Sequence, residues 1–575
     1  MKVLLIYPYF LETRLQVEDV SIVPQGVYYI AALLKKHGYD VQILNWHAIN
    51  EAPHKIKDRL IETQPDVIGF SILHANRWGG IEIARIARQI NPDIKIVFGG
   101  IGATFLWEHF LGHFPEIDYV VLGEGEYTFL NLVTCLNDGE KNKIEHIKGL
   151  AYRRDGQVVR NEDAAVICDL DQLPNPAQYF NYQHVSLTRG CAGKCNFCGS
   201  PQFWGRQVRF HSPDYFVEQL ELLYARGIRF IYVSDDTFTI NRNRVIEICR
   251  KIIQKKMEID WAAISRVDMI DEEVLFWMRK AGCIQISYGV ESGSQNIRKF
   301  LKKNISDQQI CRAFELTQHY GMMARAYFIY GCPQESWQTI QQTIDLMDTI
   351  KPLSAIFYIL DVFPGTALYQ DYKKKFKVSD DIWLNRIEDI MYFETDPALS
   401  RDLILGFGQK LRASFYEKLP EFIEALRLID RKELYPQHSD FFSRLAMTFE
   451  KGDYAGIDVI PHKKQIAEKL YRRSLEYGPK ARAYLGLGMI YQTEGAFEES
   501  IRILLEGMAL FPEDESLHIC LAVSYMNIGK FKTALSHLLK FQHRKEAIPV
   551  IANCYRALND IEKAEDYFKR YQEFG

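Results

Sequence analysis

The chain has 575 residues and a formal net charge of −4, with 47% apolar and 25% charged residues. This is an ordinary globular composition, and a usual domain size of roughly 100–200 residues predicts about three domains. The near-neutral charge excludes a general electrostatic attraction to nucleic acid or to anionic membranes. No segment approaches about 18 consecutive apolar residues, so we expect no membrane insertion.

Residues 1–140 alternate short apolar runs with amphipathic segments. The N-terminal "MKVLLIYPYF" predicts a strand and not a secretory signal, because its apolar run is short and ends at Pro8. We therefore expect a cytoplasmic protein. Further strands are predicted at 41–44, 67–71, 94–100 and 119–123. This alternation predicts an α/β domain with an open, mostly parallel sheet of Rossmann-like or flavodoxin-like type, which binds ligands at the carboxyl ends of its strands.

A connecting stretch is predicted at 141–183, where "YRRDGQVVRNED" is typical of a polar hairpin and "LDQLPNPAQYF" contains two prolines. A second alternation of strands and helices then fills 184–400. Its strand-like runs lie at 184–188, 229–236, 260–266, 284–292, 325–331 and 354–363. Six such units predict a partial (β/α)6 barrel of the TIM type, whose chemistry lies at the carboxyl ends of the strands.

The remainder of the chain is predicted to be all helical, with a connector at 401–460 and helical repeats at 461–575. Three positions of one repeat return 34 residues later, as Tyr491, Gly495 and Phe497 become Tyr525, Gly529 and Phe531. This period, with a glycine turn between paired helices, is typical of tetratricopeptide repeats. Such arrays bind peptides or partner proteins on a concave surface, although they can equally cap a neighbouring domain or mediate oligomers.

The first strand of the predicted barrel is followed by "RGCAGKCNFCGSP", in which Cys191, Cys195 and Cys198 have the spacing C-x3-C-x2-C. Four thiolates normally hold a [4Fe–4S] cluster, so three would leave one iron open to a ligand that is not protein. The neighbouring glycines allow the backbone to wrap closely around such a cluster. The spacing alone leaves open a zinc site completed by His184 or His211. The other cysteines are scattered, and we expect reduced thiols there.

The cysteine loop, with an aromatic residue at Phe197, resembles the signature of the radical SAM superfamily. Further segments resemble the successive strand-end motifs of that family, namely "YVSDDTFT" (232–239), "ISRVDMID" (264–271), "AGCIQISYGVESGS" (281–294), "YGCPQES" (330–336) and "FPGTALY" (363–369). The resemblance implies that the open iron binds the amino and carboxylate groups of S-adenosylmethionine. It also implies that an external one-electron reductant drives cleavage of the C5′–S bond, which gives a 5′-deoxyadenosyl radical.

The same resemblance implies roles for individual residues at the barrel mouth. The implied cluster ligands are Cys191, Cys195 and Cys198. The implied contacts to S-adenosylmethionine are Phe197 near the adenine, Glu291 at the ribose hydroxyls, Arg266 at the methionyl carboxylate, and Asp235, which with Asp236 ends a strand at the same mouth. A carboxylate that accepts from a diol and an arginine fork on a carboxylate are both sound chemistry. The alternative for these charged residues is an ordinary place in a loop.

The N-terminal domain resembles the cobalamin-binding domains that precede some radical SAM barrels. The likeness rests on "SIL" (71–73), "GG" (99–100) and "VVLGEGEYTF" (120–129), which follow the third, fourth and fifth strands. The implied contacts to cobalamin are Ser71, Leu73, Gly99, Gly100, Glu124 and Gly125, where small residues let a flat ligand approach the backbone. The D-x-H-x-x-G motif that supplies a cobalt ligand is missing after the first strand. His47 and His74 follow later strands, and a lone loop histidine is more often solvated.

Together these resemblances imply a cobalamin-dependent radical SAM enzyme, with a radical C-methyltransferase as the main hypothesis. Methylcobalamin would donate the methyl group to a substrate radical, and S-adenosylmethionine would recharge the cobalt. The alternatives are a cyclase or rearrangement enzyme that uses cobalamin without methyl transfer, a radical SAM enzyme that has lost cobalamin, and a tetratricopeptide adaptor without activity. A methylthiotransferase would need further N-terminal cluster cysteines, and residues 1–134 contain none. We expect a small-molecule or peptide substrate, a protein partner at the repeats, and no nucleic acid.

Overall fold

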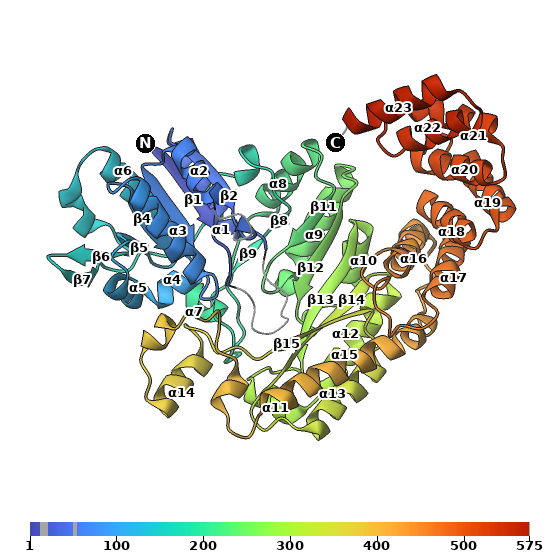
Figure 1. Ribbon diagram of the computed structural model, residues 1–575. Coiled ribbons are helices and arrows are strands. Elements are labelled where there is room, and N and C mark those ends of the chain that lie inside the picture. The colour runs from blue at the N-terminus through green and yellow to red at the C-terminus, as the bar shows by residue number, and fades with distance from the viewer. Residues whose placement is uncertain (12–20, 50–53, 574–575) are drawn as a thin grey trace. The chain divides into compact units, whose positions relative to one another are not determined.

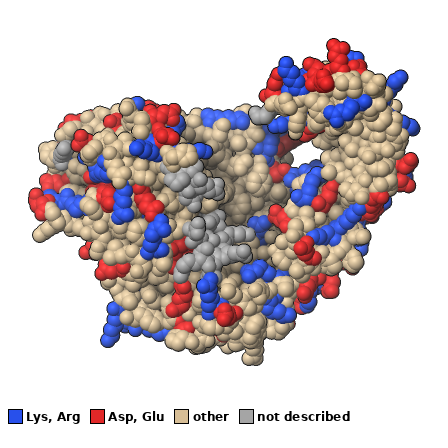
Figure 2. Space-filling view, in the orientation of Figure 1, with Lys and Arg blue, Asp and Glu red and all other residues tan. Residues whose placement is uncertain are grey.

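The computed structural model describes residues 1–11, 21–49 and 54–573 (Figure 1). The chain divides into two compact units, the first formed by 1–316 and 324–412 and the second by 317–323 and 413–575. Within the described ranges, no helix is both long enough and apolar enough to cross a membrane. On the face shown in Figure 2, acidic and basic side chains are interspersed.

The first unit begins with a seven-stranded sheet in the order β2-β1-β3-β4-β5-β6-β7. Its strands are β1 (Lys2–Tyr7), β2 (Asp40–Asn45), β3 (Val67–Ser71), β4 (Lys95–Gly99), β5 (Tyr119–Val121), β6 (Leu150–Arg154) and β7 (Gln157–Arg160). Strands β1 to β5 are parallel, as predicted, whereas β6 and β7 pair antiparallel. The hairpin predicted within 141–183 therefore forms and extends this sheet to Arg160.

Helices cover both faces of this sheet, because its strands are apolar on both sides. They are α1 (Gln25–Lys36), α2 (His54–Thr63), α3 (Arg77–Ile90), α4 (Ile101–Phe105), α5 (Trp107–His113), α6 (Glu126–Asn137) and the 3-10 helix η2 (Lys141–His146). Successive side chains of β1 enter opposite cores. Leu4 and Ile6 pack on the side of α3, while Val3 and Leu5 pack on the side of α1 and α6.

The second sheet is an open, six-stranded barrel sheet in the order β15-β14-β13-β12-β11-β8. Its strands are β8 (His184–Val185), β11 (Phe230–Val233), β12 (Asp260–Ser265), β13 (Cys283–Glu291), β14 (Met323–Tyr330) and β15 (Ser354–Ile359). The pairs β8–β11, β11–β12, β12–β13 and β14–β15 are parallel. A strand therefore lies in each predicted segment. The last one ends at Ile359, because the next residues pair with 390–392 instead.

Short elements and helices connect these strands. They are the 3-10 helices η3 (Leu170–Gln172) and η4 (Pro176–Gln178), strands β9 (Thr188–Arg189) and β10 (Arg209–Phe210), α7 (Ser200–Phe203), α8 (Pro213–Ala225), η5 (Phe238–Ile240), α9 (Arg242–Gln254), α10 (Glu272–Lys280), α11 (Gln295–Phe300), α12 (Asp307–His319), α13 (Trp337–Ile350), α14 (Ala367–Phe376), η6 (Asp380–Leu384) and η7 (Tyr392–Thr395). Strands β9 and β10 pair antiparallel on either side of the cysteine loop and α7.

The second unit is helical, as predicted. Its elements, with α15 leading in from the first unit, are α15 (Arg401–Glu424), η8 (Lys432–Leu434), α16 (Tyr435–Glu450), α17 (Lys463–Tyr477), α18 (Ala481–Thr493), α19 (Phe497–Leu510), α20 (Glu515–Asn527), α21 (Phe531–Leu538), η9 (Leu539–Phe541), α22 (Ile548–Ala557) and α23 (Ile561–Glu573). Gly495 (φ +74°) and Gly529 (φ +76°) form the left-handed turns inside the first two repeats, where glycine carries no steric penalty. Asn559 takes this place in the third copy, with φ +61°.

Candidate active site

The cysteine loop joins β9 to α7, next to the carboxyl end of β8. Cys191, Cys195 and Cys198 are free thiols that are neither fully buried nor fully exposed. Their three sulfur atoms do not all lie within 4.8 Å of one another. A single tetrahedral zinc with bonds of about 2.3 Å would hold its sulfur ligands about 3.8 Å apart. The wider arrangement fits a cluster in which each thiolate binds a different iron.

Neither histidine considered as a fourth zinc ligand is placed for that role. His211 uses both ring nitrogens, since Nδ1 lies 3.0 Å from an Asp171 carboxylate oxygen and Nε2 lies 3.0 Å from the Tyr29 hydroxyl. The Nδ1 of His184 lies 2.8 Å from the Ser234 hydroxyl. Neither histidine gathers with the three cysteines in a group of metal-ligand size. The donor set therefore favours an iron–sulfur cluster over zinc.

Backbone contacts fix the shape of the loop. Gly190 has φ +104°, and a Cβ there would stand 2.8 Å from the Gln207 carbonyl oxygen, so only glycine fits. The Asn196 side-chain amide donates to the Phe300 carbonyl at 2.8 Å, and the Asn196 carbonyl accepts from the Leu368 amide at 2.9 Å. Phe197, the next residue, packs against the apolar core. These bonds hold the loop against segments that follow β13 and β15.

Two cations lie beside the thiols. Burial raises the pKa of Cys195, while the nearby Lys303 ammonium and Arg266 guanidinium oppose that shift. Burial also raises the pKa of Cys198 to about 12. Thiolate ligation at Cys195 would therefore be favoured by these two cations, and ligation at both cysteines by the positive charge of the irons.

Glu291 ends β13 in a left-handed conformation, with φ +68°, and only 5% of the residue is exposed. One of its carboxylate oxygens lies 2.8 Å from Lys303 Nζ. A Cβ on Gly289 would stand 2.5 Å from the same oxygen, so the glycine makes room for this carboxylate. A backbone held in this unfavourable region points to a functional constraint on the Glu291 side chain.

Arg266 follows β12 and faces the same loop. Its guanidinium makes two bonds to the Asp268 carboxylate, at 2.9 and 3.0 Å. A Cβ on Gly193 would stand 3.8 Å from its Nη1, which places this nitrogen beside the cysteine loop. Arg266 therefore lies beside the cysteine loop, oriented by Asp268, and its contact with the methionyl carboxylate stays a prediction.

Asp235 and Asp236 have different surroundings, although they are neighbours in sequence. Asp235 is buried, and its Oδ1 accepts from the backbone amides of Leu187 and Thr188 at 2.8 and 3.0 Å. Its Oδ2 has no hydrogen-bond partner among the described residues, and burial raises its pKa to about 7. Asp236 accepts from the Ser200 hydroxyl at the start of α7. Asp235 thus binds the backbone of the segment that leads into the cysteine loop. A contact between its Oδ2 and S-adenosylmethionine stays a prediction.

A cavity of about 250 Å³ opens at the carboxyl ends of the N-terminal parallel strands. All of the residues predicted to contact cobalamin line it: Ser71, Leu73, Gly99, Gly100, Glu124 and Gly125. Phe203 and Trp204, at the end of α7, line it as well. The segment that follows the cluster cysteines therefore forms part of this cavity wall.

The donors and acceptors of the cavity fit cobalamin. Glycines and apolar side chains make up most of its lining, which suits a flat ligand. Glu126 also lines it, and its Oε2 is buried without a hydrogen-bond partner in the described part of the chain. A carboxamide side chain of a corrin is a donor of the kind that this oxygen lacks. Residues 12–20, which contain most of the loop without the cobalt-ligating motif, lie outside the described residues.

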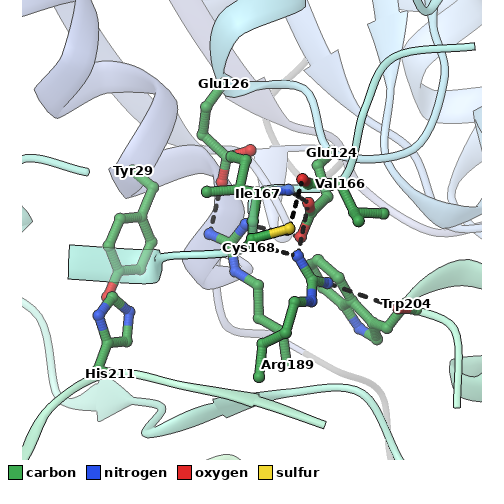
Figure 3. Close-up of polar contacts among 10 residues, drawn as sticks. Tyr29, Glu124, Glu126, Val166, Ile167, Cys168, Arg189, Trp204 and His211 are labelled. Carbon is green, nitrogen blue, oxygen red and sulfur yellow. Dashed lines mark hydrogen bonds and ion pairs between the residues drawn. The ribbon is translucent and has the colours of Figure 1, made fainter. Parts of the chain in front are cut away.

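A buried ion-pair cluster joins the cavity to the cysteine loop (Figure 3). Arg189, two residues before Cys191, lies 3.0 Å from Glu124 and 2.6 Å from Glu126. Arg209 lies 2.8 Å from the other Glu124 oxygen. The Arg189 guanidinium also lies against the rings of Tyr29 and Trp204, at 5.3 and 5.2 Å.

Within this cluster, the Glu124 carboxylate is ionised and bound by protein groups. Burial alone would raise its pKa, but Arg209 and Arg189 outweigh burial and hold the pKa below its ordinary value. Its Oε2 also accepts from the Ile167 amide at 2.7 Å. Both carboxylate oxygens therefore bind protein groups, so Glu124 also supports the cavity wall, and its contact with cobalamin stays a prediction.

Neither loop histidine of the N-terminal domain is exposed to solvent as a lone side chain. His74 Nε2 lies 3.0 Å from Asp361 Oδ2, and its ring stacks on Phe363 at 5.0 Å. His47 packs against the Phe10 ring at 5.4 Å, and its Nε2 is buried. His74 thus links the end of β3 to the segment that follows β15.

Comparison with known proteins agrees with this architecture. Residues 19–133 match the B12 binding domain, residues 185–347 match the radical SAM superfamily, and residues 481–514 match a tetratricopeptide repeat. An uncharacterized methyltransferase of Pyrococcus horikoshii is 32% identical over 382 residues, which cover 64% of this chain and 83% of the relative. The anaerobic magnesium-protoporphyrin IX monomethyl ester cyclase of Rubrivivax gelatinosus is 29% identical over 409 residues, or 68% of this chain and 73% of the relative. The cobalamin-dependent S-adenosylmethionine radical enzyme OxsB, solved with aqua-cobalamin bound, has a TM-score of 0.56 at 18% identity over 92% of this chain and 84% of its own.

The open barrel, the three-cysteine loop and the glycine-lined cavity define a radical SAM enzyme with a second cofactor site. The chain belongs to the radical SAM superfamily, among its members with an N-terminal B12-binding domain. Its cofactors are accordingly a [4Fe–4S] cluster, S-adenosylmethionine and cobalamin.

Several residues of the site were not predicted from the sequence. Lys303 lies in "RKFLKKNIS", where nothing distinguishes it from its lysine neighbours. Arg189 directly precedes the glycine of the cysteine motif, and this position is the signal that could have singled it out. Arg209 and the His74–Asp361 pair depend on contacts between distant segments, which no local pattern reveals.

Proposed function

We propose that this chain is a cobalamin-dependent radical C-methyltransferase that acts on an unactivated carbon of a small-molecule or peptide substrate. The observation that supports this most is the continuity of the segment 191–204. Its cysteines form the loop for the cluster, and its last residues, Phe203 and Trp204, line the cavity that fits cobalamin. Similarity to a relative named as a methyltransferase supports methyl transfer.

Residues on both sides of this segment would hold the reactants. When bound, the cluster and S-adenosylmethionine supply a 5′-deoxyadenosyl radical, and cobalamin supplies the methyl group. Cys191, Cys195 and Cys198 would hold the cluster. Glu291, Arg266, Phe197 and the free oxygen of Asp235 would bind S-adenosylmethionine, while the glycines at the strand ends and Glu126 Oε2 would face cobalamin.

We propose a cobalamin-binding domain at 1–140, a linker at 141–183 whose hairpin extends the sheet of that domain to Arg160, the barrel at 184–400, a connector at 401–460 and the repeats at 461–575. We propose that the repeats bind a protein partner or a peptide substrate, and that an external protein supplies the single electron. Scattered free thiols and an oxidisable cluster suit the reducing cytoplasm, where we place the enzyme.

The test is anaerobic reconstitution of the full chain with iron, sulfide and cobalamin. We expect about four irons per chain and both iron–sulfur and corrin absorption bands. With S-adenosylmethionine and a chemical reductant, 5′-deoxyadenosine should form. S-adenosylhomocysteine should form as well, since recharging the cobalt consumes a methyl group. Iron binding without corrin uptake would remove the methyl-transfer proposal and leave a radical SAM enzyme.

A radical cyclase is the second candidate, because a relative named as a cyclase matches over a similar share of the chain. A cyclase would not use S-adenosylmethionine as a methyl donor. It would therefore form 5′-deoxyadenosine without S-adenosylhomocysteine, so the ratio of the two products distinguishes the candidates.

A further inference from the structure

A group of three potential metal ligands lies on the first unit, built from residues outside the cysteine loop and the cobalamin cavity. His109 and His113 are one turn apart on α5, and Asp381 belongs to η6. Their ligand atoms all lie within 4.8 Å of one another, and no other such group occurs among residues 1–11, 21–49 and 54–573. His113 Nε2 lies 3.0 Å from Asp381 Oδ1. Two histidines four positions apart on one helix present their rings to the same side.

His109 has an unusual environment for a histidine. Only 6% of the residue is exposed, and neither ring nitrogen has a hydrogen-bond partner among the described residues. Its aromatic neighbours include Phe110, Phe114 and the His113 ring, the last at 5.1 Å. A buried polar group without a partner is costly, and such groups in native structures commonly have an unplaced ion or water as their partner. The unprotonated ring nitrogen of His109 is therefore a buried lone pair that neither accepts a hydrogen bond nor binds an ion among the described residues.

The other two side chains can close around an ion. Bonds of about 2.0–2.1 Å in a tetrahedral zinc site set the ligand atoms about 3.4 Å apart, so a small rearrangement is needed, in which the 3.0 Å contact between His113 and Asp381 opens slightly. The His113 and Asp381 side chains are 41% and 61% exposed and are free to make it. The Ser379 hydroxyl donates to Asp381 Oδ2 at 2.9 Å and leaves Oδ1 toward the histidines. This is the outer hydrogen bond that commonly orients a metal-binding carboxylate.

We propose that His109, His113 and Asp381 bind a zinc ion that ties α5 to the segment 379–384. Imidazole and carboxylate ligands with the spacing H-x3-H suit zinc, and water would complete the tetrahedron at the exposed side. The ion would give His109 the partner that it lacks. Because the segment 379–384 follows the last strand of the barrel and α5 belongs to the N-terminal domain, the ion would strengthen the attachment of these two parts.

The test uses the full chain, reconstituted with its cluster, desalted and then titrated with zinc chloride against a chromophoric chelator. The wild type should take up one zinc per chain. His113→Ala, which alters an exposed side chain, should weaken zinc binding more than about 100-fold, since even outer-shell changes at such sites cost about 10–100-fold. His109→Phe keeps the buried ring volume and should have the same effect. His146→Ala, at a 77% exposed histidine elsewhere on the first unit, is the matched control and should bind zinc normally.

X-ray absorption separates this site from zinc held by the cysteine loop. The proposed site has only nitrogen and oxygen ligands at about 2.0–2.1 Å, whereas zinc on cysteines shows sulfur at about 2.3 Å. Uptake should also survive in the Cys191→Ala, Cys195→Ala, Cys198→Ala triple variant. Zinc should raise the melting temperature of the wild type and leave that of His113→Ala unchanged. No zinc uptake, sulfur ligands, or equal uptake by His113→Ala and the wild type would overturn the proposal.

Discussion

The cysteine loop and the cobalamin cavity are held by different physical means. The loop is shaped by specific polar contacts, among them the Asn196 side-chain amide on the Phe300 carbonyl and the Leu368 amide on the Asn196 carbonyl. The cavity is shaped mainly by the absence of side chains at the ends of apolar strands, as at Gly99 and Gly100. The structure of the loop therefore depends on which polar side chains are present. The cavity depends on the volume of the side chains at the strand ends.

This contrast explains why the two regions respond differently to substitution. Replacing a polar group in the loop removes a ligand or a bond that nothing else supplies. Replacing a small residue in the cavity adds atoms, and the result depends on their size. The buried Arg189 cluster belongs to both regions, because its arginine precedes the loop and its carboxylates stand at the cavity.

The largest effect is expected from removing one cluster ligand. Cys195→Ala should abolish iron binding and 5′-deoxyadenosine formation, because two thiolates do not hold the cluster with one open iron. Iron analysis and product chromatography after anaerobic reconstitution measure both. Cys311→Ala is the control, since Cys311 is a half-buried free thiol on α12, outside the cysteine loop. Retained iron in Cys195→Ala would exclude Cys195 as a ligand.

The next largest effect tests the ion-pair cluster shared by the two regions. Arg189→Met leaves Glu126, which is 3% exposed, without its cation, and should lower the free energy of unfolding by about 3–5 kcal/mol. Urea titration followed by tryptophan fluorescence can detect this, since Trp204 lies on the Arg189 guanidinium. Arg242→Met breaks an exposed pair with Asp271 and should change the urea midpoint little. Equal midpoints for the two variants would contradict a stabilising role for the buried cluster.

A paired substitution at Gly99 tests whether volume controls the cavity. A Cβ at Gly99 would lie 3.8 Å from its nearest neighbour, so Gly99→Ala should bind cobalamin nearly normally. Gly99→Leu adds three further carbons and should weaken cobalamin binding by about 5–150-fold, as expected for overpacking of about 1–3 kcal/mol. Iron content should be the same in both variants. Normal cobalamin affinity in Gly99→Leu would show that cobalamin does not bind next to Gly99.

The last prediction concerns the pH dependence of stability at Asp235. Its pKa is about 7 in the folded protein, against an ordinary value of 3.8, so the folded state holds a proton that the unfolded state has lost between these values. The contribution of Asp235 to stability is present below about pH 4 and is lost as the pH rises toward 7. Asp235→Asn should flatten the stability profile in this window, measured by urea titration at a series of pH values. An unchanged slope would show that Asp235 is already ionised in the folded state.

The sequence predicted the fold well because both sheets follow strong local rules. Apolar runs mark β1, β3 and β4, and a 34-residue repeat marks the helical region. Such patterns predict the type of each element without knowledge of tertiary contacts. The cysteine spacing likewise revealed the loop directly. The six residues predicted to contact cobalamin line the cavity because they stand at the ends of strands, where ligands of parallel sheets bind, and the contacts themselves stay predictions.

The remaining features depend on tertiary contacts. Glu124 was expected to contact cobalamin, but its carboxylate is bonded to Arg189 and Arg209, which lie 65 and 85 positions further along the chain. Asp235 was expected at the barrel mouth, yet one of its oxygens binds backbone amides of Leu187 and Thr188. Both residues lie at the end of a strand, as the sequence predicts. The groups that bind their carboxylates come from distant segments and are seen only in the three-dimensional structure.

The position of Arg189 limits how this enzyme can be taken apart and recombined. The residue belongs to the barrel, but the acids that neutralise it, Glu124 and Glu126, belong to the other domain. A chimera that received its corrin-binding half from another protein would bury an uncompensated cation two residues from Cys191, unless the donor brought equivalent acids. The two domains are therefore not interchangeable modules. A variant that replaces either domain must keep both the arginine and the two glutamates that neutralise it.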